Sequence, residues 1–300
     1  MRVARRLLLS LLLLAAGAAL GAPPALVVEA PPELAGAARE VREIDPASFL
    51  EAQELTGVSQ PGAPIRVVLA SESSPIARQT PRFVTGFATP DDTIVLFPGR
   101  APRYPTGALA DVLRHEVAHV LLFRASNGRP LPRWFHEGVA MAASRPWGLE
   151  DRARLLLELF RPPVPLRDLE REFGGGETSA ERAYTLAGSL VQDLLESYGR
   201  GLPSAIASRV ARGASFEDAF ADVTGIPLAV EDWRFLRRQR SKERWLLVLT
   251  SSATLWALVT ALGIAAMIKR RRRDALLKRR WAEEEAAHAL AAAEADDTVN

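Results

Sequence analysis

Two short segments of the chain combine residue types that could bind a metal ion and move a proton. Residues 115–119 form the pattern H-E-x-x-H, and Glu137 follows in the segment W-F-H-E-G-V-A. On a helix, residues four apart lie one turn apart, so His115 and His119 would present two imidazoles on one face. Glu116 would point to the side of that pair, where its carboxylate can reach a metal-bound water. This arrangement is typical of zinc enzymes.

A catalytic zinc site needs a third protein ligand, and Glu137 is placed to supply it. Helix start and stop signals predict one helix near 107–126 and a second over 132–144. The first helix continues for about six residues after His119, and the second runs back for about five residues to Glu137. At about 1.5 Å per residue, these two segments cover roughly 9 Å and 8 Å in opposite directions, so their displacements nearly cancel. Gly138 and Ala140 are small enough to let the two helices approach closely. We therefore expect a helical hairpin that returns Glu137 to the level of the histidines.

The histidines also have a simpler interpretation. A histidine pair on a helix can be a satisfied polar patch, and H-E-x-x-H also occurs by chance. Three of the four histidines of this chain, however, fall within the two motifs. One of them, His136, is adjacent to Glu137 and faces about 100° away from it on the same helix. We expect His136 to face substrate or the surface and not to bind the same ion.

Together, H-E-V-A-H and W-F-H-E-G-V-A resemble the motifs of the gluzincin zinc metallopeptidases, the thermolysin-like clan, and more narrowly its single-domain peptidase MA-like group. The resemblance covers roughly residues 65–240. It implies a thermolysin-like zincin domain with His115, His119 and Glu137 as zinc ligands. It also implies that Glu116 is the general base that takes a proton from the zinc-bound water.

Two features depart from that family pattern. Gluzincins often carry a carboxylate four residues after the ligand glutamate, where it holds a histidine, and this chain has Met141 there. The sequence therefore does not assign the residue that would orient the zinc-binding histidines. The motif G-A-M-E-N, which captures a free amine in aminopeptidases, is absent. We therefore expect an endopeptidase.

A long helix expected over 178–198 carries Tyr184, the second catalytic candidate. In related metallopeptidases a tyrosine from a later helix donates a hydrogen bond to the tetrahedral oxyanion, and this segment looks similar. Tyr184 also fits an ordinary apolar stripe with Val191 and Tyr198, which would place it in the core. Both interpretations stay open. The glycines at 174–176 before this helix predict a mobile loop.

The remaining sequence predicts an α+β domain. Residues 23–64, weakly helical around 33–43 and 46–56, are interpreted as a linker followed by a packing helix, and 65–240 as the metallopeptidase domain. Strands are expected at 65–70, 82–88 and 93–97, ahead of the motif helix. Either of the last two could be an edge strand that binds the substrate backbone by β-addition, or the pair could be a purely structural hairpin. Further helices are expected at 149–161, 203–212, 215–223 and 228–242.

The two ends of the chain predict a membrane protein. Residues 1–22 have the basic, apolar and small-residue regions of a secretory signal peptide. Residues 245–268 contain no charge and are long enough to span a bilayer as a helix. With 269–300 as a cytoplasmic tail, the zinc domain lies outside the cytoplasm. The charges of Asp111 and Arg114 argue against an intramembrane protease, because such groups are costly in hydrocarbon.

Composition excludes several other classes. The chain has no cysteine, which rules out disulfides and thiolate metal sites. No basic patch interleaved with aromatic residues suggests nucleic acid. The sequence therefore predicts a membrane-anchored, zinc-dependent peptidase that acts on proteins or peptides. The alternative is a zinc-binding, non-catalytic scaffold or partner-docking protein, in which Glu116 would be dispensable.

Overall fold

The structure, a computed structural model, describes residues 21–60, 62–158 and 160–249, together with Trp256, residues 259–270 and Arg273. The chain divides into two compact units, Met1–Arg240 and Ser241–Asn300. The first unit holds the sheet and all the predicted site residues.

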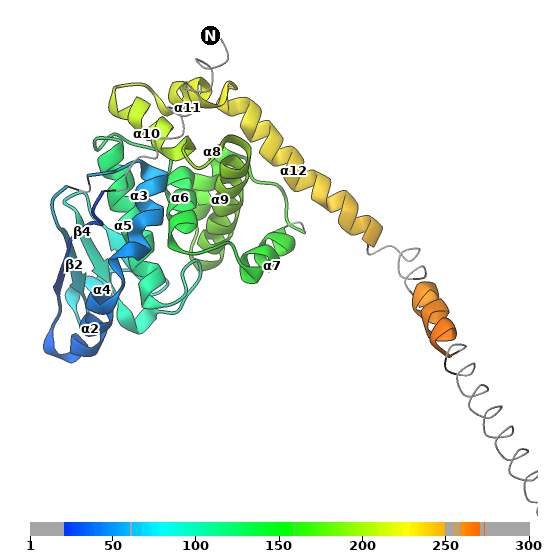
Figure 1. Ribbon diagram of the computed structural model, residues 1–300, viewed down its shortest axis with the longest axis horizontal. Helices are drawn as coiled ribbons and strands as arrows, with labels where there is room; N and C mark the ends of the chain where they lie inside the picture. The colour runs from blue at the N-terminus through cyan, green and yellow to red at the C-terminus, as the bar shows by residue number, and fades with distance from the viewer. Residues whose placement is uncertain are drawn as a thin grey trace, which may run out of the picture. The chain divides into compact units, whose positions relative to one another are not determined.

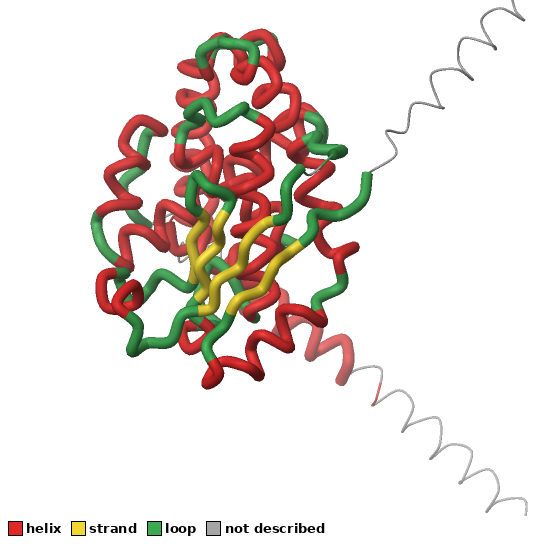
Figure 2. The backbone as a smooth tube through the Cα atoms, turned by 90° about the vertical axis from the view of Figure 1, so that its left-hand side faces the viewer, coloured by secondary structure: helices red, strands yellow, loops and turns green. Residues whose placement is uncertain are grey.

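A four-stranded sheet precedes the motif helix in the chain (Figure 2). Its strands are β1 (Leu26–Glu29), β2 (Ile65–Leu69), β3 (Gly86–Ala88) and β4 (Thr93–Leu96), in the spatial order β1-β2-β4-β3. β1, β2 and β4 are parallel, whereas β3 runs antiparallel to β4. β4 is buried along its whole length between two neighbours. Of the two segments considered as a substrate-binding edge, only β3 is therefore an edge strand.

β1 corrects the interpretation of residues 23–64 as a linker and packing helix. Leu26–Glu29 pairs with Ile65–Leu69, and Arg66 makes a two-point ion pair with Glu29 at 2.9 and 3.0 Å. The four-residue strand stands in a Pro- and Ala-rich stretch and gains its hydrogen bonds only from a partner far along the chain. Local sequence therefore gives little sign of it. The helical part of the segment matches the prediction.

Helices make up most of the remaining described chain and confirm the α+β class (Figure 1). Their order along the chain agrees with the expected pattern, with two additions, α4 and α8, that the sequence did not indicate. Short 3-10 turns occur at Pro32–Leu34, Pro46–Phe49 and Pro98–Arg100. The helices are α2 (Ala35–Glu43), α3 (Leu50–Thr56), α4 (Pro75–Gln79), α5 (Leu109–Ala125), α6 (Arg133–Ser144), α7 (Leu149–Glu158), α8 (Leu166–Gly174), α9 (Glu177–Tyr198), α10 (Leu202–Ala211), α11 (Phe216–Thr224) and α12 (Leu228–Leu249).

Three helices form the centre of the domain. α5 packs on the sheet side against β3 and β4, and α6 lies between α5 and α9. Their facing side chains, among them Leu113, Phe135 and Leu190, are fully buried in one core cluster. This packing fixes the relative position of the two helices that carry the metal-binding motifs.

Gly138 serves a different contact from the one predicted. A Cβ atom at this position would lie 2.3 Å from Cγ2 of Val191 and 2.7 Å from the backbone oxygen of Ala187. Both neighbours belong to α9. The missing side chain therefore lets α6 approach α9, whereas the sequence suggested that it served the α5–α6 hairpin.

The glycines at 174–176 do not form the expected loop. Leu166–Gly174 is a helix, and Gly176, with φ of 95°, is the residue before α9. Glycine adopts this left-handed conformation without the strain that a Cβ would add. The chain therefore turns from α8 into α9 within two residues.

Among the described residues, no helix is both long enough and apolar enough to cross a membrane. Part of the predicted span at 245–268, namely residues 250–255 and 257–258, lies outside the described residues. So do almost all of the predicted signal at 1–22 and most of the tail at 269–300. These three assignments stay predictions.

Candidate metal centre

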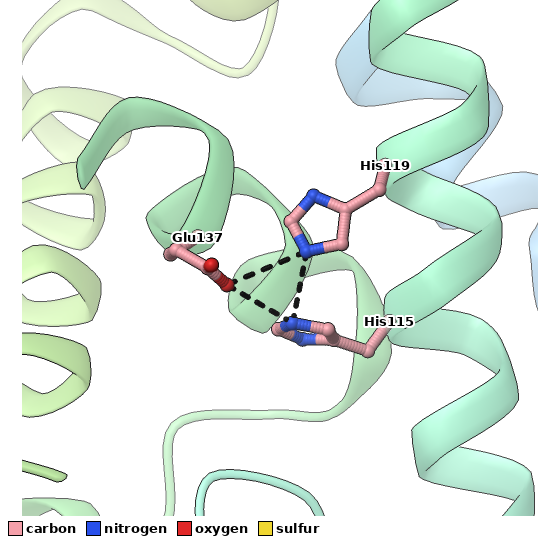
Figure 3. Close-up of side chains that lie close together, drawn as sticks. All are labelled: His115, His119 and Glu137. Carbon is pink, nitrogen blue, oxygen red and sulfur yellow. Dashed lines mark hydrogen bonds and ion pairs between the residues drawn. The ribbon is translucent and has the colours of Figure 1, made fainter. Parts of the chain in front are cut away.

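The α5–α6 hairpin presents three metal-binding side chains to one point (Figure 3). Asn127 and Gly128, with φ of 53° and 71°, reverse the chain after α5, and α6 begins directly after Pro132. His115 and His119 point from α5 toward α6. Glu137 returns from α6 to meet them, as the nearly equal lengths of the two helical segments predict.

The three side chains converge through single atoms. Nε2 of His115 lies 3.1 Å from Nε2 of His119. Oε2 of Glu137 lies 3.3 Å from the first nitrogen and 3.4 Å from the second. The three donor atoms thus form a nearly equilateral triangle. In the part of the chain that the structure describes, this is the group of histidine and acidic side chains that could hold a metal ion.

The triangle has the dimensions of a metal-binding face. A tetrahedral zinc ion with ligand atoms about 2.0–2.1 Å away holds neighbouring ligand atoms about 3.3–3.4 Å apart. The distances of 3.1 to 3.4 Å fit this value. Two imidazole nitrogens and a carboxylate oxygen are also atom types that bind zinc, so a cation between them is favoured. Two histidines and one glutamate are a ligand set found in catalytic zinc sites.

The surroundings favour the charged form of Glu137. Its side chain is only 10% exposed. Burial raises the pKa of Glu137, but His119 and His115 together lower it more, so the pKa lies well below its usual range. Nε of Arg133, one helical turn earlier, lies 3.4 Å from Oε1. Oε1 thus contacts a guanidinium, while Oε2 faces the histidines.

Glu116 lies beside the triangle without joining it. It is 5% exposed, and it lines the same cleft as the three converging residues. Burial, with a smaller contribution from the charge of Glu137, raises the pKa of Glu116 to about 7, and the nearby His119 opposes this rise. Gly86, Phe87 and Ala88 of edge strand β3 line the cleft together with Glu116. The glutamate is thus suited to exchange a proton near neutral pH.

His136 is closer to the site than the sequence suggested. Its Nδ1 lies 3.4 Å from Nδ1 of His119, and the two rings are 5.6 Å apart at 33°. Nδ1 is the ring nitrogen of His119 that does not face Glu137. Burial and the nearby His119 lower the pKa of His136 to about 4, so the ring is neutral at pH 7. By contrast, Nδ1 of His115 is buried without a hydrogen-bond partner among the described residues.

Tyr184 reaches the same cleft from α9. It is half-buried and lines the cleft together with Arg133. Burial and then the charge of Glu137 raise the pKa of Tyr184, so the phenol stays protonated. Its ring meets Phe173 edge-on at 5.3 Å, and the guanidinium of Arg133 stacks on the ring of Phe173 at 4.6 Å. Tyr184 therefore lies both against the core and at the cleft.

The cleft has a volume of about 570 Å³. It is lined by edge strand β3 and the two residues after it, by α5, and by residues of α6 and α9. The sequence did not single out Arg133 or Phe173. Arg133 could have been found from its position four residues before Glu137 on one helix face. Phe173 belongs to α8, which local sequence did not predict.

No family model matches this chain, and no curated protein matches it. Functional conclusions about the protein therefore rest on the geometry and chemistry of the cleft.

Proposed function

We propose that the protein is a zinc-dependent peptidase of the gluzincin type, with a thermolysin-like zincin domain. One observation carries the proposal: the triangle of His115, His119 and Glu137 shares a cleft with Glu116, which is buried but is not part of the triangle. A separate carboxylate beside a three-ligand site is what a metal-assisted hydrolase requires. Storage or transport of a metal ion gives no reason for it.

Each residue of the cleft has a distinct role in this mechanism. His115, His119 and Glu137 hold the zinc ion. When bound, zinc lowers the pKa of a water molecule and polarises a carbonyl group. Glu116 takes a proton from the attacking water and later passes it to the nitrogen of the departing amine. A carboxyl group with a pKa near 7 can both accept and release a proton at neutral pH.

Tyr184 is proposed to donate a hydrogen bond to the oxyanion that forms as the carbonyl is attacked. Its hydroxyl stays protonated and therefore has a hydrogen to donate. Such a donor acts mainly in the transition state. Arg133 lines the same cleft and contacts Glu137.

The position of edge strand β3 at the cleft favours a peptide as the substrate. Gly86, Phe87 and Ala88 line the cleft, and β3 pairs with β4 along one side only. An extended peptide can add to such an edge through main-chain hydrogen bonds. Because the chain lacks the amine-capturing motif of aminopeptidases, we propose cleavage within a chain.

The domain is proposed to lie outside the cytoplasm. A signal at 1–22 and a span at 245–268 give this topology whether or not the signal is cleaved. Reporters active only outside the cytoplasm, fused after residue 240 and after residue 300, test it. Activity at the second junction and not at the first would reverse the topology.

The alternative scaffold function needs a closed zinc site with a fourth protein ligand. His136 is the nearest additional imidazole, and its Nδ1 faces His119. The decisive experiment measures zinc content and cleavage of a panel of denatured proteins by the full chain and by Glu116→Gln. We expect both proteins to bind one zinc and only the wild type to cleave. Equal cleavage by the variant would exclude the peptidase mechanism and favour the scaffold.

A further inference from the structure

Helix α7 is attached to the domain by its polar side and turns its apolar side outward. The outward residues, which we call the α7 stripe, have exposed fractions of 83%, 55%, 64% and 69%. Near 100° per residue, the three leucines of the stripe span roughly 100° of the helix circumference, and Asp151 and Glu158 point the opposite way. This reverses the usual orientation of a surface helix. The stripe consists of Leu149, Leu156 and Leu157 of α7 and of Phe160, two residues after the end of the helix.

Ion pairs hold the inward face of α7 in place. Asp151, which is fully buried, accepts two hydrogen bonds from Arg145 at 2.6 and 2.7 Å. Glu158 accepts from Arg182 of α9 at 2.7 Å. Arg154 donates a hydrogen bond to Glu181, also of α9, at 3.0 Å. These contacts fix the rotation of α7 about its own axis, so the α7 stripe faces away from the domain.

The stripe ends where the chain leaves the domain. Val164, four residues after Phe160, exchanges two backbone hydrogen bonds with the side-chain amide of Gln239, at 3.1 and 3.2 Å. Gln239 is six residues before Trp245, the first residue of the proposed span. Even a fully extended chain of six residues reaches only about 22 Å. If residues 245–268 span a bilayer, the segment that follows α7 therefore lies within about this distance of the start of the span.

We propose that the α7 stripe inserts into the interfacial layer of the lipid bilayer and rests the domain on the membrane. Exposed leucine and phenylalanine side chains can enter the boundary between headgroups and acyl chains by roughly 5–10 Å. We propose that lipid covers the α7 stripe. The alternative that the experiment distinguishes is contact with the stripe of a second copy of the chain. The proposal rests on the proposed span and is independent of the peptidase chemistry.

The chain has no cysteine, so a single Leu156→Cys variant carries one environment-sensitive fluorophore. The full chain is reconstituted into vesicles of phosphatidylcholine and phosphatidylglycerol, with and without lipids that carry a nitroxide near the headgroup. The matched control is Ile76→Cys, an exposed apolar residue of α4, which is 39% exposed. Figure 1 places α4 and α7 at opposite sides of the first unit.

We expect the Leu156→Cys probe to show blue-shifted emission and to be quenched by the nitroxide lipids, and the Ile76→Cys probe to show neither. Equal, water-like emission from both probes would overturn the proposal. A blue shift without quenching, growing with the protein-to-lipid ratio, would assign the α7 stripe to a second copy and also overturn it. Retention of each variant in the membrane after alkaline extraction is measured in parallel. Loss of the chain from the membrane would refute the span and the stripe together, whatever the hydrolytic activity.

Discussion

Nδ1 of His136 lies 3.4 Å from Nδ1 of His119, next to the triangle of donor atoms. Two ring nitrogens attract each other only when one donates and the other accepts a proton. If Nε2 of His119 binds the metal, its Nδ1 carries the hydrogen and donates to the neutral ring of His136. His136 then fixes the tautomer and orientation of His119, the task that a carboxylate performs in many metal sites.

We predict that His136→Ala lowers zinc affinity by roughly 10–100-fold, the usual effect of removing such a partner. Competition with a chromophoric chelator measures the affinity. His136→Asn is the matched variant, because its side-chain oxygen can accept the same hydrogen bond, and it should retain most of the affinity. An alanine variant that binds zinc like the wild type would show that His136 does not support the metal.

The two buried glutamates of the cleft should respond differently to the same substitution. Glu137→Gln replaces an anionic ligand by a neutral amide and should lose the zinc ion under dialysis. Glu116→Gln should retain it, because Glu116 is not part of the triangle of donor atoms. Zinc is measured after gel filtration of each variant. Equal zinc in the two variants would remove Glu137 from the ligand set.

Glu116→Gln should also lose nearly all hydrolysis, because proton transfer of this kind contributes roughly a hundred- to ten-thousandfold in rate. A chelator should abolish wild-type cleavage, and added zinc should restore it. The same treatment should leave the glutamine variant inactive. Recovery of activity by that variant at saturating zinc would mean that its defect is weak metal binding and not a missing base.

We predict that Tyr184→Phe lowers kcat with little effect on KM, by on the order of a hundredfold for one lost oxyanion donor. Tyr198→Phe is the control. It lies on the same helix, and its hydroxyl contacts Arg234 at 3.5 Å, away from the cleft residues. Cleavage of a fluorogenic peptide is followed at several substrate concentrations. A Tyr184 variant with wild-type kcat, or with lowered stability alone, would return Tyr184 to a core role.

The hairpin that carries the triangle could be predicted because its signals are local. α5 at Leu109–Ala125 and α6 at Arg133–Ser144 nearly match the expected 107–126 and 132–144. The position of each residue on these helices follows from helix geometry alone. To predict the site, the only long-range assumption required was that the second helix packs antiparallel to the first.

Features that depend on distant partners were missed. β1 exists through its pairing with β2, and the place of Tyr184 depends on Phe173 in the unpredicted helix α8. His136 was expected to face substrate or the surface, and the neighbouring helix places Nδ1 of His119 3.4 Å from its ring nitrogen. The geometry of one helix predicts the direction of a side chain. It does not predict which residue of another helix that side chain contacts.

Gly138 gives a stability test of the α6–α9 contact. Gly138→Ala should destabilise the domain by about 1–3 kcal/mol or more, because the added methyl meets a backbone oxygen that cannot move away. Gly36→Ala in α2 is the control, since no atom lies within 4 Å of its Cβ position. That change should stabilise by about 0.4–1 kcal/mol. Denaturant unfolding followed by circular dichroism measures both. A Gly138 variant as stable as the wild type would contradict the close approach of the helices.

Tyr104 and Thr185 form a buried hydrogen bond with a defined direction. Their oxygens are 2.9 Å apart, and the hydroxyl of Thr185 donates to the backbone oxygen of Glu181 at 2.9 Å. Thr185 has only one hydrogen to give, so Tyr104 is the donor. Burial raises the pKa of Tyr104 to about 12, although the hydrogen bond and nearby arginines lower it. Ionisation removes the donor and leaves a buried phenolate.

The unfolded chain ionises this phenol near pH 10, and the folded chain only near pH 12. The folded state therefore keeps its proton longer, and its stability relative to the unfolded state falls as pH rises from 10 to 12. At about 1.4 kcal/mol per pKa unit, the loss at pH 12 and above is roughly 3 kcal/mol. Tyr104→Phe should be less stable at pH 8, because the hydrogen bond is gone, and should lose less stability between pH 8 and pH 12. Burial also raises the pKa of Tyr184, but that residue is present in both proteins, so the difference isolates Tyr104. Urea unfolding at a series of pH values measures it, and parallel stability curves for the two proteins would show that Tyr104 ionises as freely in the folded domain as in water.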